Sequence, residues 1–127
     1  MAPLSPDQDL PDADALLGTL RETVRSLVRR DGPDLSARQL AVFLICYLED
    51  GPHTVRGLAV QLDVAKSAIT RALDRLGTFD LAARVDDPQD GRSVIVRQTR
   101  AGKLFLKDLR SYLRTAAKMA RPEALSS

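Results

Sequence analysis

The sequence predicts a mainly α-helical fold with one small β-hairpin, an α+β class, and three observations lead to this prediction. Two short amphipathic helices flank a tight turn at residues 63–65. A hairpin follows them, and its connection, residues 87–92, is rich in turn-forming residues. Longer helices with apolar stripes are expected at both ends, over residues 12–30 and 99–120. We therefore expect a helix-turn-helix and a hairpin between two terminal helices.

The N-terminal part of the chain divides into an arm and a helix. Residues 1–11 combine prolines with acidic side chains and little apolar surface, which predicts a flexible acidic, proline-rich arm. A helix is expected over residues 12–30, and Gly32 and Pro33 end it, because Gly suits the left-handed position after a helix and Pro cannot continue one. Its apolar stripe consists of Leu16, Leu17, Leu20, Val24, Leu27 and Val28.

The second helix begins at a capping box formed by Ser36 and Gln39. Residues 40–48 are apolar on nearly every side, which predicts a helix in the middle of the fold, ended by residues 51–52. Cys46 lies in this apolar run, where a thiol is normally inert. We therefore expect Cys46 to be a buried core residue and not a redox sensor.

The helix-turn-helix is expected to start at Thr54, which can cap a helix over residues 55–62. After the turn, a further helix is expected over residues 66–76. The residues on its predicted buried side are Ile69, Ala72, Leu73 and Leu76. The residues on its predicted outer side are Lys66, Ser67, Thr70, Arg71 and Asp74.

Residues 81–86 and 93–98 are expected to form the two strands of the hairpin. Thr99 then caps a final helix over residues 99–120, and residues 121–127 are left as a tail. The apolar stripe of this helix consists of Phe105, Leu109, Tyr112, Leu113, Ala116 and Ala120.

A helix-turn-helix followed by a charged hairpin is the layout of a winged-helix DNA-binding domain. We therefore expect residues 12–120 to form a single winged-helix domain. Its recognition helix, residues 66–76, would enter the major groove, and its wing, residues 86–93, the minor groove of double-stranded DNA.

The charge of the chain is distributed unevenly. The formal net charge is +2, but every Lys and Arg lies at or after Arg21, and four Asp residues precede it. Residues 21–127 therefore carry a net charge of +6, which is compatible with a polyanionic partner.

Other functional classes find little support in the sequence. There is no apolar run long enough for a membrane span and no secretory signal, and one cysteine cannot form an internal disulfide, so a cytoplasmic location is expected. Glycine-rich phosphate loops, nucleophile elbows and Cys/His pairs are absent, which argues against an enzyme. His53 has no second histidine to share a metal, and the acidic residues of the hairpin lack the spacing of a calcium loop. No cofactor or metal is expected.

The middle of the chain resembles the MarR family of winged-helix transcription regulators over roughly Leu35 to Leu109. The resemblance is carried by LSARQLAVFLICYLEDG, then TVRGLAVQLDVAKSAITRALDRL, then DLAARVDDPQDGRSVIVRQTRAGK. The last segment is the most specific, because it joins a D-x-R wing to a strand and a T-x-x-G helix start. The resemblance implies a bacterial homodimer that binds a pseudopalindromic operator, usually as a repressor.

The resemblance also implies roles for individual positions. On the recognition helix, the base- and phosphate-facing residues would be Lys66, Ser67, Ala68, Thr70 and Arg71. The DNA-binding residues of the wing would be Asp90, Gly91 and Arg92. In this set, Asp90 would hold Arg92 in position, and Arg92 would point into the minor groove. Contacts with the DNA backbone are assigned to Thr54 and Arg75. A dimer interface is expected on the terminal helices, at Leu16, Leu20, Val24, Leu27, Leu109, Tyr112, Leu113 and Ala116.

The sequence departs from the family pattern at several positions. Ala65 stands where a Ser often caps the recognition helix, Asp80 replaces the usual Gly after that helix, and Gln98 replaces a Leu. The chain ends at Ser127, one helix short of the usual family length, so a smaller or differently arranged dimer is expected. A small-molecule effector is possible in this family, but the sequence identifies none.

Three alternatives remain open at this point. The basic residues of the fourth helix could form an ordinary solvated face, and the terminal stripes could pack on the chain's own core. A winged-helix module can also serve protein–protein contact without binding DNA specifically.

Overall fold

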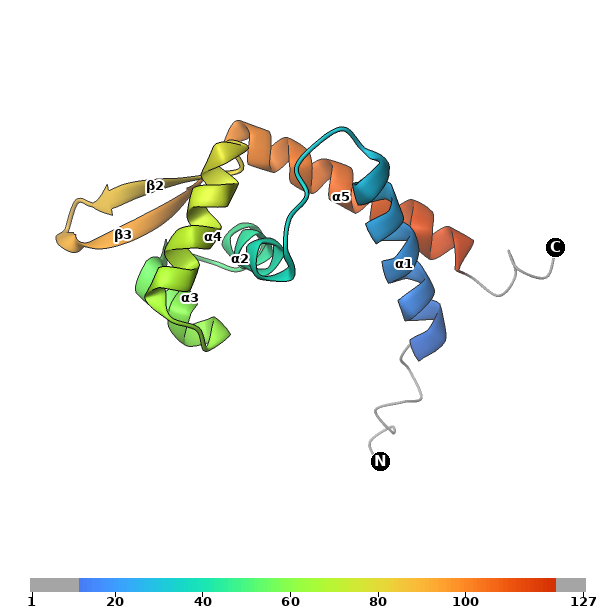
Figure 1. Cartoon of the computed structure of the whole chain (residues 1–127), viewed down its shortest axis with the longest axis horizontal. Helices are drawn as coiled ribbons and strands as arrows, with labels where there is room; N and C mark the ends of the chain where they lie inside the picture. The colour runs from blue at the N-terminus through green and yellow to red at the C-terminus, as the bar shows by residue number, and fades with distance from the viewer. Residues whose placement is uncertain (1–11, 121–127) are drawn as a thin grey trace, which may run out of the picture. The chain divides into compact units, whose positions relative to one another are not determined.

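The computed structural model of the protein describes residues 12–120 (Figure 1). The elements follow the order α1 (Ala13–Arg29), α2 (Ala37–Leu48), β1 (His53–Thr54), α3 (Val55–Leu62), α4 (Lys66–Thr78), β2 (Ala82–Asp87), β3 (Asp90–Gln98) and α5 (Arg100–Met119). This is the mainly α-helical winged-helix fold class that the sequence predicts. The expected arm, 1–11, and the expected tail, 121–127, lie outside the described residues.

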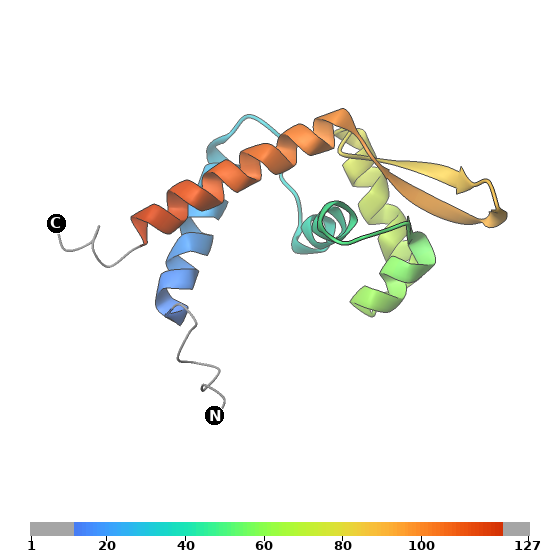
Figure 2. The same ribbon diagram turned by 180° about the vertical axis from the view of Figure 1, so that it is seen from behind.

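The described residues divide into two compact units. One is Pro33–Lys107, which holds the helix-turn-helix and the hairpin; the other consists of the residues up to Gly32 and those from Asp108 onward. Figure 2 shows the first unit from behind, with the β2–β3 hairpin projecting beyond α3 and α4.

Local capping decides where the helices begin. Ser36 and Gln39 form the predicted capping box of α2, with both reciprocal hydrogen bonds present. The Thr54 hydroxyl accepts a hydrogen bond from the backbone N–H of Gly57 at 2.9 Å and so caps α3. Ala65 precedes α4 and supplies no side-chain cap, also as predicted.

The core of the Pro33–Lys107 unit is built around α2. Phe43 is fully buried, stacks on Tyr47 with ring centroids 4.3 Å apart, and meets Phe105 edge-on at 5.1 Å. The four apolar residues predicted on the inner side of α4 are all buried: Ile69, Ala72, Leu73 and Leu76. Cys46 is buried as well, and desolvation by burial raises the pKa of its thiol to about 12.

The hydroxyl of Tyr47 connects three distant segments of the chain. It donates to the carbonyl of Leu81 at 2.6 Å and accepts from the backbone N–H of Thr99 at 2.9 Å. Next to it, the Gln98 side chain donates to the carbonyl of Cys46 at 3.1 Å. Gln98, which departs from the family pattern, thus holds the end of β3 against α2.

The sheet has three antiparallel strands in the order β1-β3-β2. The sequence did not predict β1, which pairs His53 with Val96 and has only two residues. The hairpin connection is also tighter than the expected span 87–92, because β2 extends to Asp87 and β3 starts at Asp90. The Asp87 carboxylate accepts from the backbone N–H of Gln89 and closes this turn.

The chain leaves α4 through a residue in the left-handed conformation. Asp80 has φ 57°, in the left-handed region. Gly adopts this conformation most readily, and Asp tolerates it, which explains why Asp can stand at this position. Its carbonyl accepts a hydrogen bond from the Thr99 hydroxyl, which also caps α5 through the N–H of Gly102. The turn after α4 and the start of α5 are therefore tied together.

In the other unit, α1 lies against the later part of α5. Arg30 forms an ion pair with Asp108 at 3.4 Å, and a Cβ at Gly18 would lie 3.7 Å from the Cβ of Ala120. The apolar stripe of α1 nevertheless remains exposed in this chain at Leu16, Leu17, Leu20, Val24 and Val28.

The described part of the chain has neither a helix suited to span a membrane nor a cluster of metal-ligating side chains. Among residues 12–120, no helix combines the length and apolar composition that a membrane crossing requires. Within the same residues, no three His, Cys, Asp or Glu side chains are grouped so that they could hold a metal ion.

Gly102→Ala is expected to lower the free energy of unfolding by about 2–4 kcal/mol, because the added methyl group overpacks a tight contact and breaks hydrogen bonds. A Cβ at Gly102 would lie 2.5 Å from Cζ of Tyr47 and closer still to its hydroxyl oxygen. Urea denaturation measures the loss.

Gly91→Ala is the matched control, because a Cβ at Gly91 meets no atom within 4 Å. Its stability should stay within about 0.5 kcal/mol of the wild type. Equal stability of Gly102→Ala and the wild type would show that Tyr47 does not need this close approach.

Candidate nucleic-acid interface

The outer face of α4 carries most of the residues that the sequence assigned to it. Lys66, Ser67 and Arg71 are exposed, and Thr70 is half-buried. Ala68, also expected to face DNA, is 6% exposed. Its side chain lies on the core side of α4 with Ile69, so it cannot contact a base, and we correct that expectation.

The hairpin presents Arg92 from a backbone held by Asp90. The Asp90 carboxylate accepts from the backbone N–H of Arg92 at 3.1 Å and from the Ser93 hydroxyl at 3.1 Å. The acid thus fixes the main chain from which the exposed Arg92 side chain extends. Gly91 is exposed between them.

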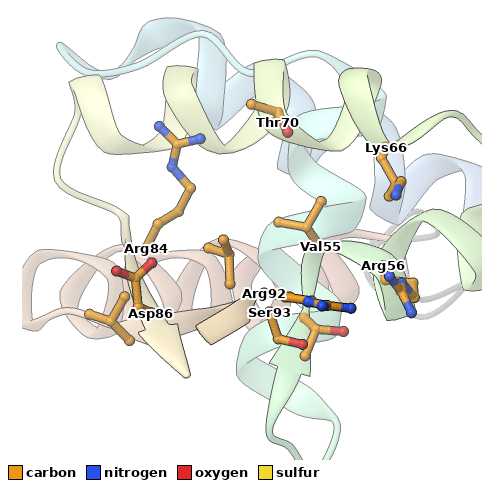
Figure 3. A pocket seen from close by; sticks show the side chains of 11 residues that line it. Val55, Arg56, Lys66, Thr70, Arg84, Asp86, Arg92 and Ser93 are labelled. Carbon is orange, nitrogen blue, oxygen red and sulfur yellow. The ribbon is translucent and has the colours of Figure 1, made fainter. Parts of the chain in front are cut away.

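A groove lies between the outer face of α4, the start of α3 and the hairpin (Figure 3). Its cavity volume is about 420 Å³. The residues that line it are Thr54, Val55, Arg56, Lys66, Thr70, Arg84, Val85, Asp86, Arg92, Ser93 and Val94. The groove therefore collects residues from α3, α4, β2 and β3, as well as the residue that caps α3.

The lining of the groove is strongly basic. Four cationic side chains contribute to it, and one carboxylate, that of Asp86, opposes them. The cations are Arg56, Lys66, Arg84 and Arg92. The hydroxyls of Thr54, Thr70 and Ser93 add hydrogen-bonding groups. A concave surface of this composition is suited to an anion with several oxygen atoms, such as a chain of phosphates.

The sequence reasoning missed Arg56 and Arg84. Arg56 lies in the first turn of α3, next to the cap at Thr54 that was identified. Arg84 and Asp86 are two apart on β2, so strand alternation alone places them on one face. Which face turns toward α4 depends on the pairing of β2 with β3, and this register is not readable from β2 itself.

The two expected DNA-backbone residues lie in different surroundings. Thr54 lines the groove while its hydroxyl also caps α3. Arg75 is exposed on α4, and its guanidinium carbon lies 4.6 Å from the centre of the Phe79 ring. Arg75 is not among the residues that line the groove.

The residues expected at a dimer interface also separate into groups. Four are exposed (Leu16, Leu20, Val24 and Leu113), and two are half-buried (Leu27 and Tyr112). Leu109 and Ala116 are 5% and 1% exposed, so the chain itself already covers them. We therefore remove these two from the set available to a partner.

Comparison with known proteins gives a consistent result. Residues 35–94 match the model of the MarR family. A crystal structure of MarR is 26% identical, with a TM-score of 0.59 over 82% of this chain and 79% of that one. The transcriptional regulator Tm0710 from Thermotoga maritima is 21% identical, with a TM-score of 0.62 over 89% of this chain and 78% of that one.

Reduced AbfR bound to DNA is 18% identical, with a TM-score of 0.60 over 80% of this chain and 70% of that one. No curated protein matches the chain.

Proposed function

Because residues 35–94 match the model of the MarR family, we propose that this protein is a sequence-specific double-stranded DNA-binding transcription regulator that acts as a repressor. The observation that carries the proposal is the basic groove between α4 and the hairpin, which adjoins the exposed face of α4. The protein is a regulator and not an enzyme in this proposal, and it needs no cofactor.

In this proposal α4 enters the major groove. The start of α4 has backbone N–H groups without a side-chain cap, and these groups favour a phosphate. Lys66 and Ser67 add a cation and a donor at the same end. Arg71, about one turn further on, can donate two hydrogen bonds to O6 and N7 of a guanine. Thr70 can contact a phosphate or a thymine methyl group.

The hairpin enters the neighbouring minor groove. Arg92 is its exposed cation, and Asp90 keeps the backbone beside it in place. A narrow minor groove has the most negative potential, so Arg92 is best accommodated at A·T-rich sequence.

A homodimer completes the proposal. Burial of the exposed stripe of α1 against a second copy removes apolar surface from water, and a two-fold axis gives two recognition helices. Such a dimer binds a pseudopalindromic operator, and its occupation of that operator blocks transcription.

Arg71→Ala is expected to weaken binding to a duplex selected from a random library by about 1–3 kcal/mol and to relax the choice of one base pair. The reason is the loss of a bidentate contact, in which the guanidinium donates two hydrogen bonds to the edge of one base. Titration of labelled duplexes with single base-pair changes measures both effects. Lys103→Ala, which removes an exposed cation on α5 outside the groove, is the control and should bind as the wild type does.

Unchanged affinity and unchanged base choice would remove Arg71 from base recognition. If the wild type binds no duplex even at low salt, the DNA-binding proposal fails. The same surface would then be better explained as a docking site for another protein.

Arg92→Ala is expected to weaken binding to operators with A·T-rich flanks more than to those with G·C-rich flanks, because the guanidinium prefers a narrow minor groove. Competition between two duplexes that differ only in these flanks measures the difference. Equal losses on both duplexes would argue against insertion of this side chain into the minor groove.

The protein is expected to be a dimer at micromolar concentration, and Leu20→Glu to be a monomer, because the variant places a charge in the centre of the exposed α1 stripe. Light scattering gives both masses. Val60→Glu is the control, since Val60 is 77% exposed on α3, outside the proposed interface. A monomer mass for the wild type would rule out the proposed dimer.

A further inference from the structure

The groove has a defined place on DNA if the proposed function holds, and the following inference rests on that function. The sugar–phosphate backbone of each strand separates the major groove from the minor groove. A protein that places α4 in one and the hairpin in the other must therefore accommodate one backbone between them. The cavity between α4 and the hairpin is the space available for it.

Arg84 spans this space from the side of the hairpin. It lies on β2, and its guanidinium points toward α4 (Figure 3). There its Nη2 donates a hydrogen bond to Oδ1 of Asp74, which lies on the outer side of α4. The ion pair joins the recognition helix to the base of the hairpin, and both residues belong to one compact unit.

The exposure of this ion pair limits what it can do for the fold. The side chains of Arg84 and Asp74 are 41% and 55% exposed. Ion pairs at such positions are screened by water and contribute little to folding stability. Meanwhile the guanidinium has five N–H donors, and the contact with Asp74 occupies one of them. The remaining donors are available to an acceptor in the groove.

We propose that Arg84 binds a backbone phosphate of the DNA in this groove, and that Asp74 is a positioning residue that holds the guanidinium for that contact. The planar guanidinium can serve a carboxylate on one side and a phosphate on another, which a lysine ammonium does less well. Asp74 itself does not contact the phosphate, and it acts only through Arg84.

Asp86, on the same strand as Arg84, has the opposite effect on a phosphate. It lies two residues from Arg84 and also lines the groove, but it carries the opposite charge. Within residues 12–120, Asp86 forms no ion pair with a basic side chain. The carboxylate that lines the groove, that of Asp86, therefore opposes phosphate, whereas Asp74, outside the lining, holds a cation that lines it.

The first arm of the test is the salt dependence of binding. Arg84→Gln and the control Lys103→Gln are titrated with the selected duplex and with a random duplex at several salt concentrations. Arg84→Gln should weaken binding to both duplexes by a similar factor, on the order of tenfold. It should also lower the slope of log K against log salt by about 1. Lys103→Gln should leave the affinity and the slope unchanged.

The second arm tests positioning with a double-mutant cycle. Asp74→Asn should weaken binding in the wild-type background, because Arg84 loses the partner that orients it. In the Arg84→Gln background, Asp74→Asn should have no effect on binding. Thermal unfolding of all four proteins shows whether the fold is intact, and their melting temperatures should agree within a few degrees.

The outcomes separate this inference from the proposed function. If the wild type binds DNA but Arg84→Gln keeps the full salt slope, Arg84 does not contact a phosphate and the inference is overturned. If Asp74→Asn changes binding equally in both backgrounds, Asp74 acts on the DNA directly, and its positioning role is overturned. If the wild type binds no duplex at all, it is the proposed function that fails.

Discussion

The hydrogen bonds of one tyrosine hydroxyl connect separate segments of the Pro33–Lys107 unit. Tyr47 of α2 donates to the carbonyl at the start of the hairpin, at Leu81, and accepts from the backbone at Thr99, where the hairpin ends. The start of β2 and the end of β3 are therefore held by the same half-buried side chain. Gly102 permits the close approach, because any larger residue would collide with that hydroxyl. The position of the hairpin beside α4, and thus the groove, depends on this junction.

The sequence predicts those parts of the fold that depend on interactions between residues close together in the chain. The capping box at Ser36 and Gln39 and the missing cap at Ala65 are each decided within three or four residues. The buried side of α4 follows from helical spacing. The strand β1 escapes prediction because its two residues are ordered by pairing with β3, more than 40 positions away in the sequence.

The candidate site is less predictable for the same reason. Helical spacing places Lys66 and Arg71 outside, but Ala68 borders the buried side next to Ile69, and resemblance alone assigned it to DNA. Leu109 and Ala116 do lie on an apolar stripe. The spacing of apolar residues cannot show whether the chain itself or a partner covers that stripe. Arg84 was missed because its neighbour Asp74 is ten positions away, which neither helical nor strand spacing connects.

The net charge of the chain does not reveal how the fold distributes its charged side chains. The chain carries only +2, because the acidic residues nearly balance the basic ones. Folding concentrates Arg56, Lys66, Arg84 and Arg92 from separate elements around one groove, where their fields add. Asp86 reduces this local charge, and Asp74 directs part of it by holding one guanidinium. A weakly charged chain can therefore present a concave surface whose cations suit phosphates.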